Sequence, residues 1–239
     1  MTMLKKFLEE YPLRTDATKT KVWVVGGING KLQLAKDIVY TIESSRILAK
    51  NDSIIFLGNF MGDTDENRDT INFVYEYQKL RNTQVTVLRG SVEQRFLLAK
   101  ESFFQTPEGK ATLRSYRDKQ KGDFLTKDFF NAQQWINQLP SYFVSENYYL
   151  VHAGVNGKRS LREQDPQAVM FCDETTFTSG ETDYERLVVR SSLVPPSLNI
   201  STPNSFAVGQ GNIVIFDDAD RKVMPETLEV QSSTTHLNP

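Results

Sequence analysis

Three short stretches decide the fold of this chain: VVGGING at 24–30, IFLGNFMG at 55–62 and VLRGSVE at 87–93. Each begins with apolar residues typical of a buried strand and then turns at a glycine. The glycines that close the three strands, Gly26, Gly58 and Gly90, follow one another at intervals of 32 residues. A fourth unit of the same kind, LVHAG, lies at 150–154. The repetition predicts a sheet whose buried strands end in tight loops.

The segments between the first three strands have apolar residues at helical spacing. Helices are predicted over 32–48, 65–81 and 92–101, each following one of the strands 21–26, 53–58 and 84–89. Strands that alternate with helices favour a largely parallel sheet that is covered on both faces. The fold class is therefore α/β.

The rest of the chain predicts further helices and a second sheet. Helices are expected at 3–10 and 131–139, and a polar segment at 106–128 reads as helices or a surface insertion. Strands are expected at 142–144 and 148–151, followed by an irregular region with short helices at 156–186. The strands of the second sheet are predicted at 187–189, 205–208, 212–216 and 223–230.

Length and composition indicate one globular domain. The chain has 239 residues, of which 39% are hydrophobic and 24% charged, enough for a substantial core. We expect a lead-in over 1–20, a single domain over 21–230 and a mobile, Ser/Thr-rich tail over 231–239.

Charge and hydropathy argue against several classes of partner. The net charge is −2 and no dense run of Lys and Arg occurs, so nucleic acid is not expected as a partner. No run of about 18 apolar residues predicts a membrane span, and the charged segment 1–12 lacks the apolar core of a signal peptide. The single cysteine, Cys172, excludes an internal disulfide and is expected to pack in the interior. We expect a cytoplasmic protein or a component of a virion, not secreted through a signal peptide.

The four strand-and-turn units resemble motifs of the calcineurin-like metallophosphoesterases, in the branch of the serine/threonine protein phosphatases. That family reads GDxHG, GDxxDRG, GNHE and HAG at the corresponding places, and the resemblance covers roughly residues 21–216. It implies a β-sandwich flanked by helices, in four layers α/β/β/α, with a dinuclear metal site at the carboxyl ends of the strands. Two such metal ions activate a hydroxide that attacks a phosphate ester.

The resemblance extends to the glycines but not to the metal ligands. The family's ligand positions fall here on Gly27, Asn29, Asn59, Ser91, His152 and Ser191. Only His152 matches a family ligand; glycine has no donor, and neutral amides are weak substitutes for carboxylates and imidazoles. We therefore expect no metal cofactor. The alternative is one weakly bound divalent metal near His152.

The family's acid and phosphate-holding positions are also changed. The histidine that protonates the leaving group falls on Val92, and the aspartate that orients it falls on Gly62. The phosphate-clamping arginine falls on Asp63, where a carboxylate would repel phosphate. Arg89 and Glu93 match residue types that are common at these positions in the family. Glu93 is expected to order a loop rather than to act as a base.

These losses predict a phosphatase-like pseudoenzyme that binds another protein or assembles with itself. The compact size is similar to bacteriophage and bacterial versions of the family, which suggests a structural or regulatory part of an assembly such as a virus particle. One alternative is a phosphoesterase with an altered site around Asn29, Asn59, Glu93 and His152. Another is a binder of phosphorylated ligands that uses Arg89 and Arg190.

Three further patterns have weaker functional readings. The segment 26–31 lacks the spacing and the hydroxyl of a nucleotide-binding phosphate loop. The segment 63–69 begins like a calcium loop, but its sixth position is Arg68 rather than glycine and the twelfth would be Val74 rather than glutamate, so it is predicted to be a solvated acidic loop that caps the next helix. Aromatic residues that could fill the core or anchor a partner are Phe103, Phe104, Phe124, Phe129, Phe130 and Trp135.

Overall fold

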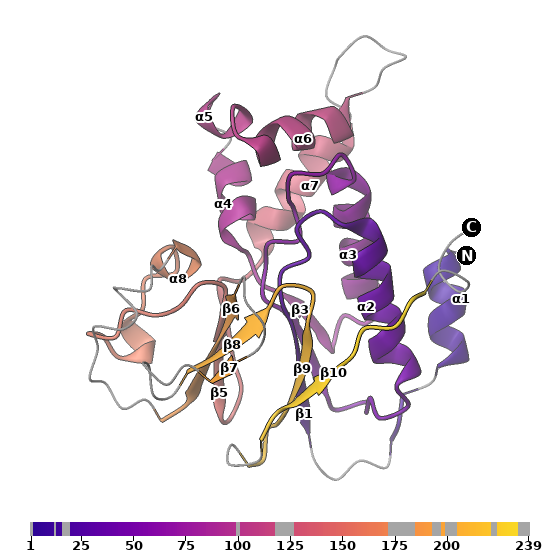
Figure 1. Ribbon diagram of the computed structural model, residues 1–239, viewed down its shortest axis with the longest axis vertical. Coiled ribbons are helices and arrows are strands. Elements are labelled where there is room, and N and C mark those ends of the chain that lie inside the picture. Colours follow the sequence, from indigo (N-terminus) through magenta and orange to yellow (C-terminus); the bar gives the residue numbers. More distant parts are fainter. Residues whose placement is uncertain are drawn as a thin grey trace.

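The computed structural model contains two five-stranded sheets with helices on their outer sides (Figure 1). It describes residues 2–11, 13–15, 20–98, 101–117, 127–171, 185–192, 197–198, 205–220 and 224–233. Cys172 and Phe124 lie outside these ranges. The helices are α1 (Met3–Glu10), α2 (Leu32–Ser44), α3 (Asn67–Leu80), α4 (Ser91–Leu98), α5 (Glu101–Phe104), α6 (Pro107–Tyr116), α7 (Lys127–Gln138), the 3₁₀ turn η1 (Leu161–Glu163) and α8 (Ala168–Phe171). The strands are β1 (Lys21–Val25), β2 (Ser53–Phe56), β3 (Val85–Val87), β4 (Tyr142–Val144), β5 (Tyr148–Val151), β6 (Leu187–Ser192), β7 (Ser197–Leu198), β8 (Ser205–Gly209), β9 (Ile213–Asp217) and β10 (Glu226–Leu228).

The first sheet has the strand order β10-β9-β1-β2-β3. Strands β1, β2 and β3 are parallel, as the alternation of strands and helices predicts. The prediction that 212–216 and 223–230 belong to the second sheet was wrong. Strand β9 pairs antiparallel with β1 from Lys21–Asp217 to Val25–Ile213, and β10 pairs with β9. The open edge of β1, opposite β2, accepts β9 along its whole length.

The second sheet has the order β4-β5-β6-β8-β7. Its central strands β5, β6 and β8 are parallel, and the outer strands β4 and β7 are antiparallel to their neighbours. Strand β6 continues to Ser192, three residues beyond the predicted end at Val189, because β8 pairs with it as far as Gly209.

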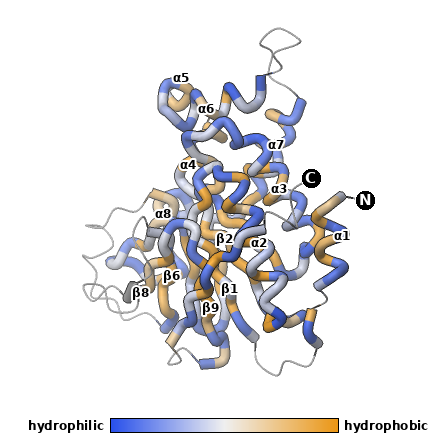
Figure 2. The backbone as a smooth tube through the Cα atoms, turned by 45° about the vertical axis from the view of Figure 1, so that its right-hand side comes forward, coloured by the Kyte–Doolittle hydropathy of each residue, from blue (hydrophilic) through white to orange (hydrophobic). Residues whose placement is uncertain are grey.

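Both faces of β1 are buried, which places the sheets between layers of helices. Trp23 and Val25 face a core shared with α1, α2, α3 and α7, whereas Val22 and Val24 face a second core between the two sheets. A third, smaller core under α8 covers the outer face of the second sheet. Apolar segments concentrate on the strands in the interior (Figure 2). The layers therefore run α/β/β/α, as the resemblance implies.

Residues at both ends of the described chain contact the domain. Leu4, Phe7 and Leu8 of α1 are part of the core between the helices and the first sheet. At the other end, the Gln231 amide donates to Thr41 Oγ1 at 2.7 Å and the Ser233 amide donates to Asp37 Oδ1 at 2.7 Å. These two hydrogen bonds connect Gln231 and Ser233 to α2.

Candidate functional site

The loops after β1, β2, β3 and β5 bring most of the predicted site positions together. The loop after β1 contacts the loop after β2, because the amides of Ile28 and Asn29 donate to the Asn59 carbonyl at 3.0 and 2.8 Å. Ser91 Oγ lies 3.4 Å from Asn59 Oδ1 and 3.5 Å from His152 Nε2. The parallel strands β1, β2 and β3 end at the same edge of the first sheet, and the loop after β5 of the second sheet meets them there through His152.

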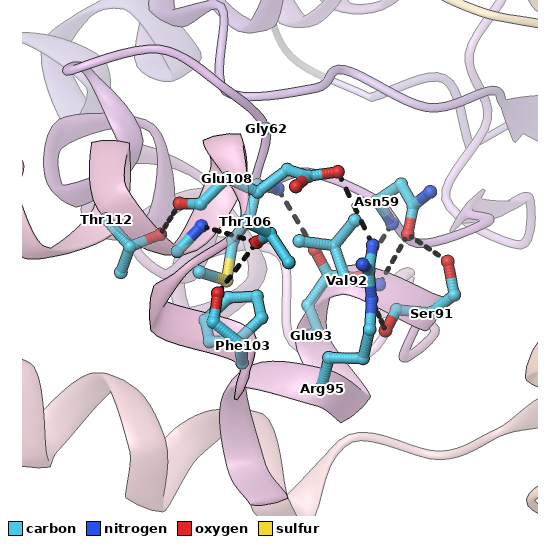
Figure 3. A network of polar contacts seen from close by, with 12 residues as sticks. Asn59, Gly62, Ser91, Val92, Glu93, Arg95, Phe103, Thr106, Glu108 and Thr112 are labelled. Carbon is cyan, nitrogen blue, oxygen red and sulfur yellow. Dashed lines mark hydrogen bonds and ion pairs between the residues drawn. The ribbon is translucent and has the colours of Figure 1, made fainter. Parts of the chain in front are cut away.

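Asn59 acts as a hydrogen-bonding hub between these loops. Its backbone has a φ of 52°, in the left-handed region that asparagine tolerates better than most residues. Its side-chain Oδ1 accepts hydrogen bonds from the Val92 amide at 3.1 Å and from the Ser91 hydroxyl (Figure 3). The oxygen that would bridge two metal ions in the related motif is therefore engaged at the start of α4.

Glu93 connects the loops after β2 and β3 through its buried carboxylate. Its side chain is fully buried, and its carboxylate accepts hydrogen bonds from the amides of Asn59 at 2.7 Å, Gly90 at 2.9 Å and Met61 at 3.0 Å. Burial raises the pKa of Glu93 to about 7, although the backbone N–H donors act in the opposite direction. This geometry fits the predicted loop-ordering role.

His152 is buried with a fixed orientation. Its Nδ1 lies 2.8 Å from the Leu57 carbonyl oxygen, which can only accept, so Nδ1 carries the proton in the neutral ring. Nε2 then has the lone pair and faces Ser91. Burial lowers the pKa of His152 to about 4, so the ring is neutral at pH 7.

The two buried groups predict opposite pH dependences of stability. The pKa of His152 falls from 6.5 to about 4 on folding, so its contribution of about 3 kcal/mol is present above pH 6.5 and is lost as pH falls through 4. The pKa of Glu93 rises from 4.5 to about 7, so its contribution of about 3 kcal/mol is present below pH 4.5 and is lost as pH rises through 7.

Replacing one of the two residues should leave the pH dependence of the free energy of unfolding that is due to the other. Relative to the natural protein, His152→Gln should gain stability as the pH is lowered from 7 to 4.5, whereas Glu93→Gln should lose it. Urea unfolding at four pH values measures both slopes. Parallel pH profiles for the two variants would contradict these assignments.

The position of the family's orienting aspartate, Gly62, has no room for a side chain. A Cβ atom on Gly62 would lie 2.2 Å from the Asn29 carbonyl oxygen. Asn67 fixes this loop, accepting from the Gly62 amide at 2.9 Å and donating to the Gly62 carbonyl at 2.7 Å. The neighbouring Asp63 is exposed, and Val92 is a buried apolar residue.

Three of the predicted site residues, Ser191, Arg190 and Arg89, lie outside the lining of the hollow at the strand ends. Ser191 on β6 donates its amide to the His152 carbonyl at 2.9 Å, which places it beside the loop after β5. Arg190 is buried on β6, and Arg89 donates its amide to Pro140 at 2.9 Å. Neither arginine is among the residues that line the hollow at the strand ends.

That hollow has a volume of about 420 Å³ and lies over the loops just described. Its lining includes the predicted positions Asn29, Asn59, Gly62, Asp63, Ser91 and Val92. Sequence reasoning missed four polar residues of the lining: Lys31, Arg95, Glu108 and Gln210. Arg95 could have been found from its position one helical turn after Ser91, and it pairs with Glu108 at 3.5 Å. No sequence signal connects Glu108 on α6 or Gln210 after β8 to this place.

The donors at this site do not fit a dinuclear metal centre. Two dications need several carboxylates or imidazoles, yet Glu93 is engaged by three backbone amides and Asn59 Oδ1 by the start of α4. Within the described part of the chain, no group of three or more His, Cys, Asp or Glu side chains could hold a metal ion. In the same residues, no helix is both long enough and apolar enough to cross a bilayer.

Comparisons with known proteins identify the fold through structure alone. No sequence model of a known protein family matches the chain, and no curated protein sequence matches it. A serine/threonine phosphatase from Saccharomyces cerevisiae, with similarity to human phosphatase PP5, superimposes with a TM-score of 0.61 at 12% identity, covering 95% of this chain and 87% of its own.

Two further solved structures agree with that match. A candidate diadenosine tetraphosphatase superimposes with a TM-score of 0.56 at 15% identity, covering 91% of this chain and 97% of its own. A metallophosphoesterase from Sphaerobacter thermophilus gives a TM-score of 0.51 at 12% identity, covering 90% of each chain. The chain therefore has the calcineurin-like phosphoesterase fold.

Proposed function

We propose that this protein is a phosphatase-like pseudoenzyme that serves as a protein-binding scaffold, in a structural or regulatory assembly such as a virus particle. By pseudoenzyme we mean a protein that has lost the metal-dependent hydrolysis of phosphate esters. The folded body is kept, and its function is to bind a protein partner or further copies of itself.

The observation that carries this proposal is that the side-chain atoms that could bind a metal ion instead make hydrogen bonds within the structure. Asn59 caps the start of α4, Glu93 ties three backbone amides together, and His152 Nδ1 donates to a backbone carbonyl. The loop after β1 also fills the space that a side chain at Gly62 would need. Metal binding, proton donation and phosphate holding would each need a different change to be restored.

Exposed aromatic residues support the binding role. Of the predicted aromatic set, Phe103 and Phe129 are buried, whereas Phe130 on α7 is 60% exposed. Tyr75 on α3 is 44% exposed and its ring contacts Trp135 with centroids 5.4 Å apart. Aromatic side chains are enriched at the centres of protein interfaces. Tyr75 and Phe130 are therefore the first residues to substitute once a partner is found.

An assay of phosphate-ester turnover tests the catalytic half of the proposal. The protein should hydrolyse p-nitrophenyl phosphate no faster than the buffer does, with manganese, zinc or iron supplied. Metal-dependent turnover that His152→Ala abolishes would overturn the proposal and establish the altered, reduced metal site instead. A gain in melting temperature with phosphopeptide, lost in Arg89→Ala, would favour the binder of phosphorylated ligands.

The scaffold half is tested by the state of the protein in its native source. We expect it to copurify with a partner or to sediment as an assembly of its own copies. The double substitution Tyr75→Ala and Phe130→Ala should weaken that association while leaving the melting temperature within a few degrees. A strictly monomeric protein with no partner in its source would contradict the scaffold role.

A further inference from the structure

Ser91 and His152 form a hydroxyl–imidazole pair at the carboxyl ends of the strands. Strand β3 ends at Val87, the chain turns through Gly90, and α4 begins at Ser91. The serine hydroxyl is half-buried and lines the hollow, and its Oγ lies 3.5 Å from His152 Nε2. A nucleophile and a base within hydrogen-bond reach, with the base oriented by a third group, are the elements of an activated serine.

The third group is the carbonyl of Leu57. Because this oxygen accepts the Nδ1 proton at 2.8 Å, the neutral imidazole presents the Nε2 lone pair toward Ser91. The ring is buried behind the serine, so the hollow gives access to the hydroxyl rather than to the imidazole. The orientation of His152 therefore places a proton acceptor, Nε2, next to an accessible hydroxyl.

The lining of the hollow around Ser91 carries charges of both signs. Its carboxylates are Asp63 and Glu108, and its cations are Lys31 and Arg95, of which Arg95 pairs with Glu108 at 3.5 Å. Fixed positive charges near a developing oxyanion stabilise it in a partly desolvated site. The serine hydroxyl lies at similar distances from two acceptors, Asn59 Oδ1 at 3.4 Å and His152 Nε2 at 3.5 Å, and rotation about its C–O bond turns its proton from the amide oxygen to the imidazole.

We propose that Ser91 is a nucleophilic serine that forms a covalent ester with small activated carboxylic or phosphonic esters, with His152 as the proton acceptor. With a fluorophosphonate, the bond between Ser91 Oγ and phosphorus forms, the phosphorus–fluorine bond breaks and fluoride leaves. The hydroxyl proton moves to His152 Nε2. The step needs no metal ion and no further reactant.

This inference goes beyond the proposed scaffold role and does not rest on it. The scaffold role concerns the loss of metal-dependent phosphatase chemistry and the use of other surfaces for binding. A serine that reacts once with an activated ester is compatible with both, and its absence would leave both unchanged.

The test is covalent labelling of the full chain by a fluorophosphonate probe, followed by intact-mass analysis and peptide mapping. We expect one adduct per folded chain, located on Ser91, and none after unfolding in urea. Ser91→Ala should abolish the adduct. His152→Gln should slow labelling by about 100-fold, the usual order for loss of a general base.

Ser160 provides a matched control. It is exposed and its hydroxyl donates to the Glu163 carboxylate at 2.7 Å, so it has a basic neighbour but no imidazole. Ser160→Ala should label at the rate of the natural protein. The proposal is overturned if the folded protein gives no adduct, if Ser91→Ala keeps it, or if unfolded protein labels equally fast. Labelling of a folded His152→Gln variant at the natural rate would equally remove His152 from the reaction.

Discussion

Replacing Gly62 by alanine is expected to lower the free energy of unfolding by about 3 kcal/mol or more, as overpacking against a rigid backbone does. The new Cβ would meet the Asn29 carbonyl oxygen at 2.2 Å and the Asn29 Cα at 2.9 Å. Neither loop can move away freely, because Asn67 holds the Gly62 backbone with two hydrogen bonds and Asn59 holds the Asn29 amide. Urea unfolding measures the change.

Gly27→Ala is the matched control for this substitution. Gly27 lies in the same pair of loops, but a Cβ there would make ordinary contacts of 3.5–3.6 Å with Asn59 and Asn29. Its effect should stay within about 1 kcal/mol. Equal costs for the two variants would show that the close approach of Gly62 to Asn29 does not exist in solution. A large cost at Gly62 alone would explain why the family's aspartate cannot simply be restored here.

Replacing Glu93 by alanine is expected to lower the free energy of unfolding by about 4 kcal/mol. The truncation leaves the amides of Asn59, Met61 and Gly90 without their acceptor in a buried place and opens a cavity beneath the loops. The loop after β2 should also become mobile, which hydrogen exchange at Asn59 and Met61 would detect as lost protection.

Glu66→Ala provides the comparison for this prediction. Glu66 also accepts a hydrogen bond from the backbone of a distant loop, at 3.3 Å from the Leu32 amide, but it is exposed to solvent. Water can replace its carboxylate, so the cost should be below about 1 kcal/mol. If Glu93→Ala were no more costly than Glu66→Ala, Glu93 would not be the structural centre of the site.

The first three strands could be predicted from sequence because each is a compact apolar run that ends at a glycine. Sheet membership could not, because the pattern of 212–216 is the same whether β9 joins β1 or β8. Helix ends were less accurate: α2 was expected to continue to Leu48 but ends at Ser44, since Arg46 adopts a left-handed φ of 58°. Such a conformation is uncommon for arginine and has no sequence signal.

In the site, too, features set by neighbouring residues could be predicted from sequence, whereas contacts between distant segments could not. Asn59, Ser91 and His152 could be placed at strand ends because each follows a predicted strand within two residues. The contact of Gly62 with the Asn29 carbonyl, and the presence of Glu108 and Gln210 in the hollow, depend on how separate loops and helices pack. The residue types at the motif positions can therefore be read from the sequence, but the groups that occupy the space around them cannot.

The central claim is that this fold has lost its metal-dependent chemistry, and metal content per chain tests it most directly. The protein is purified after manganese, zinc and iron have been supplied, and bound metal is quantified by mass spectrometry. Our account predicts far less than one metal ion per chain, unchanged by His152→Ala. One or two ions per chain, lost in His152→Ala, would contradict it and make His152 with Asn29 and Asn59 a metal site.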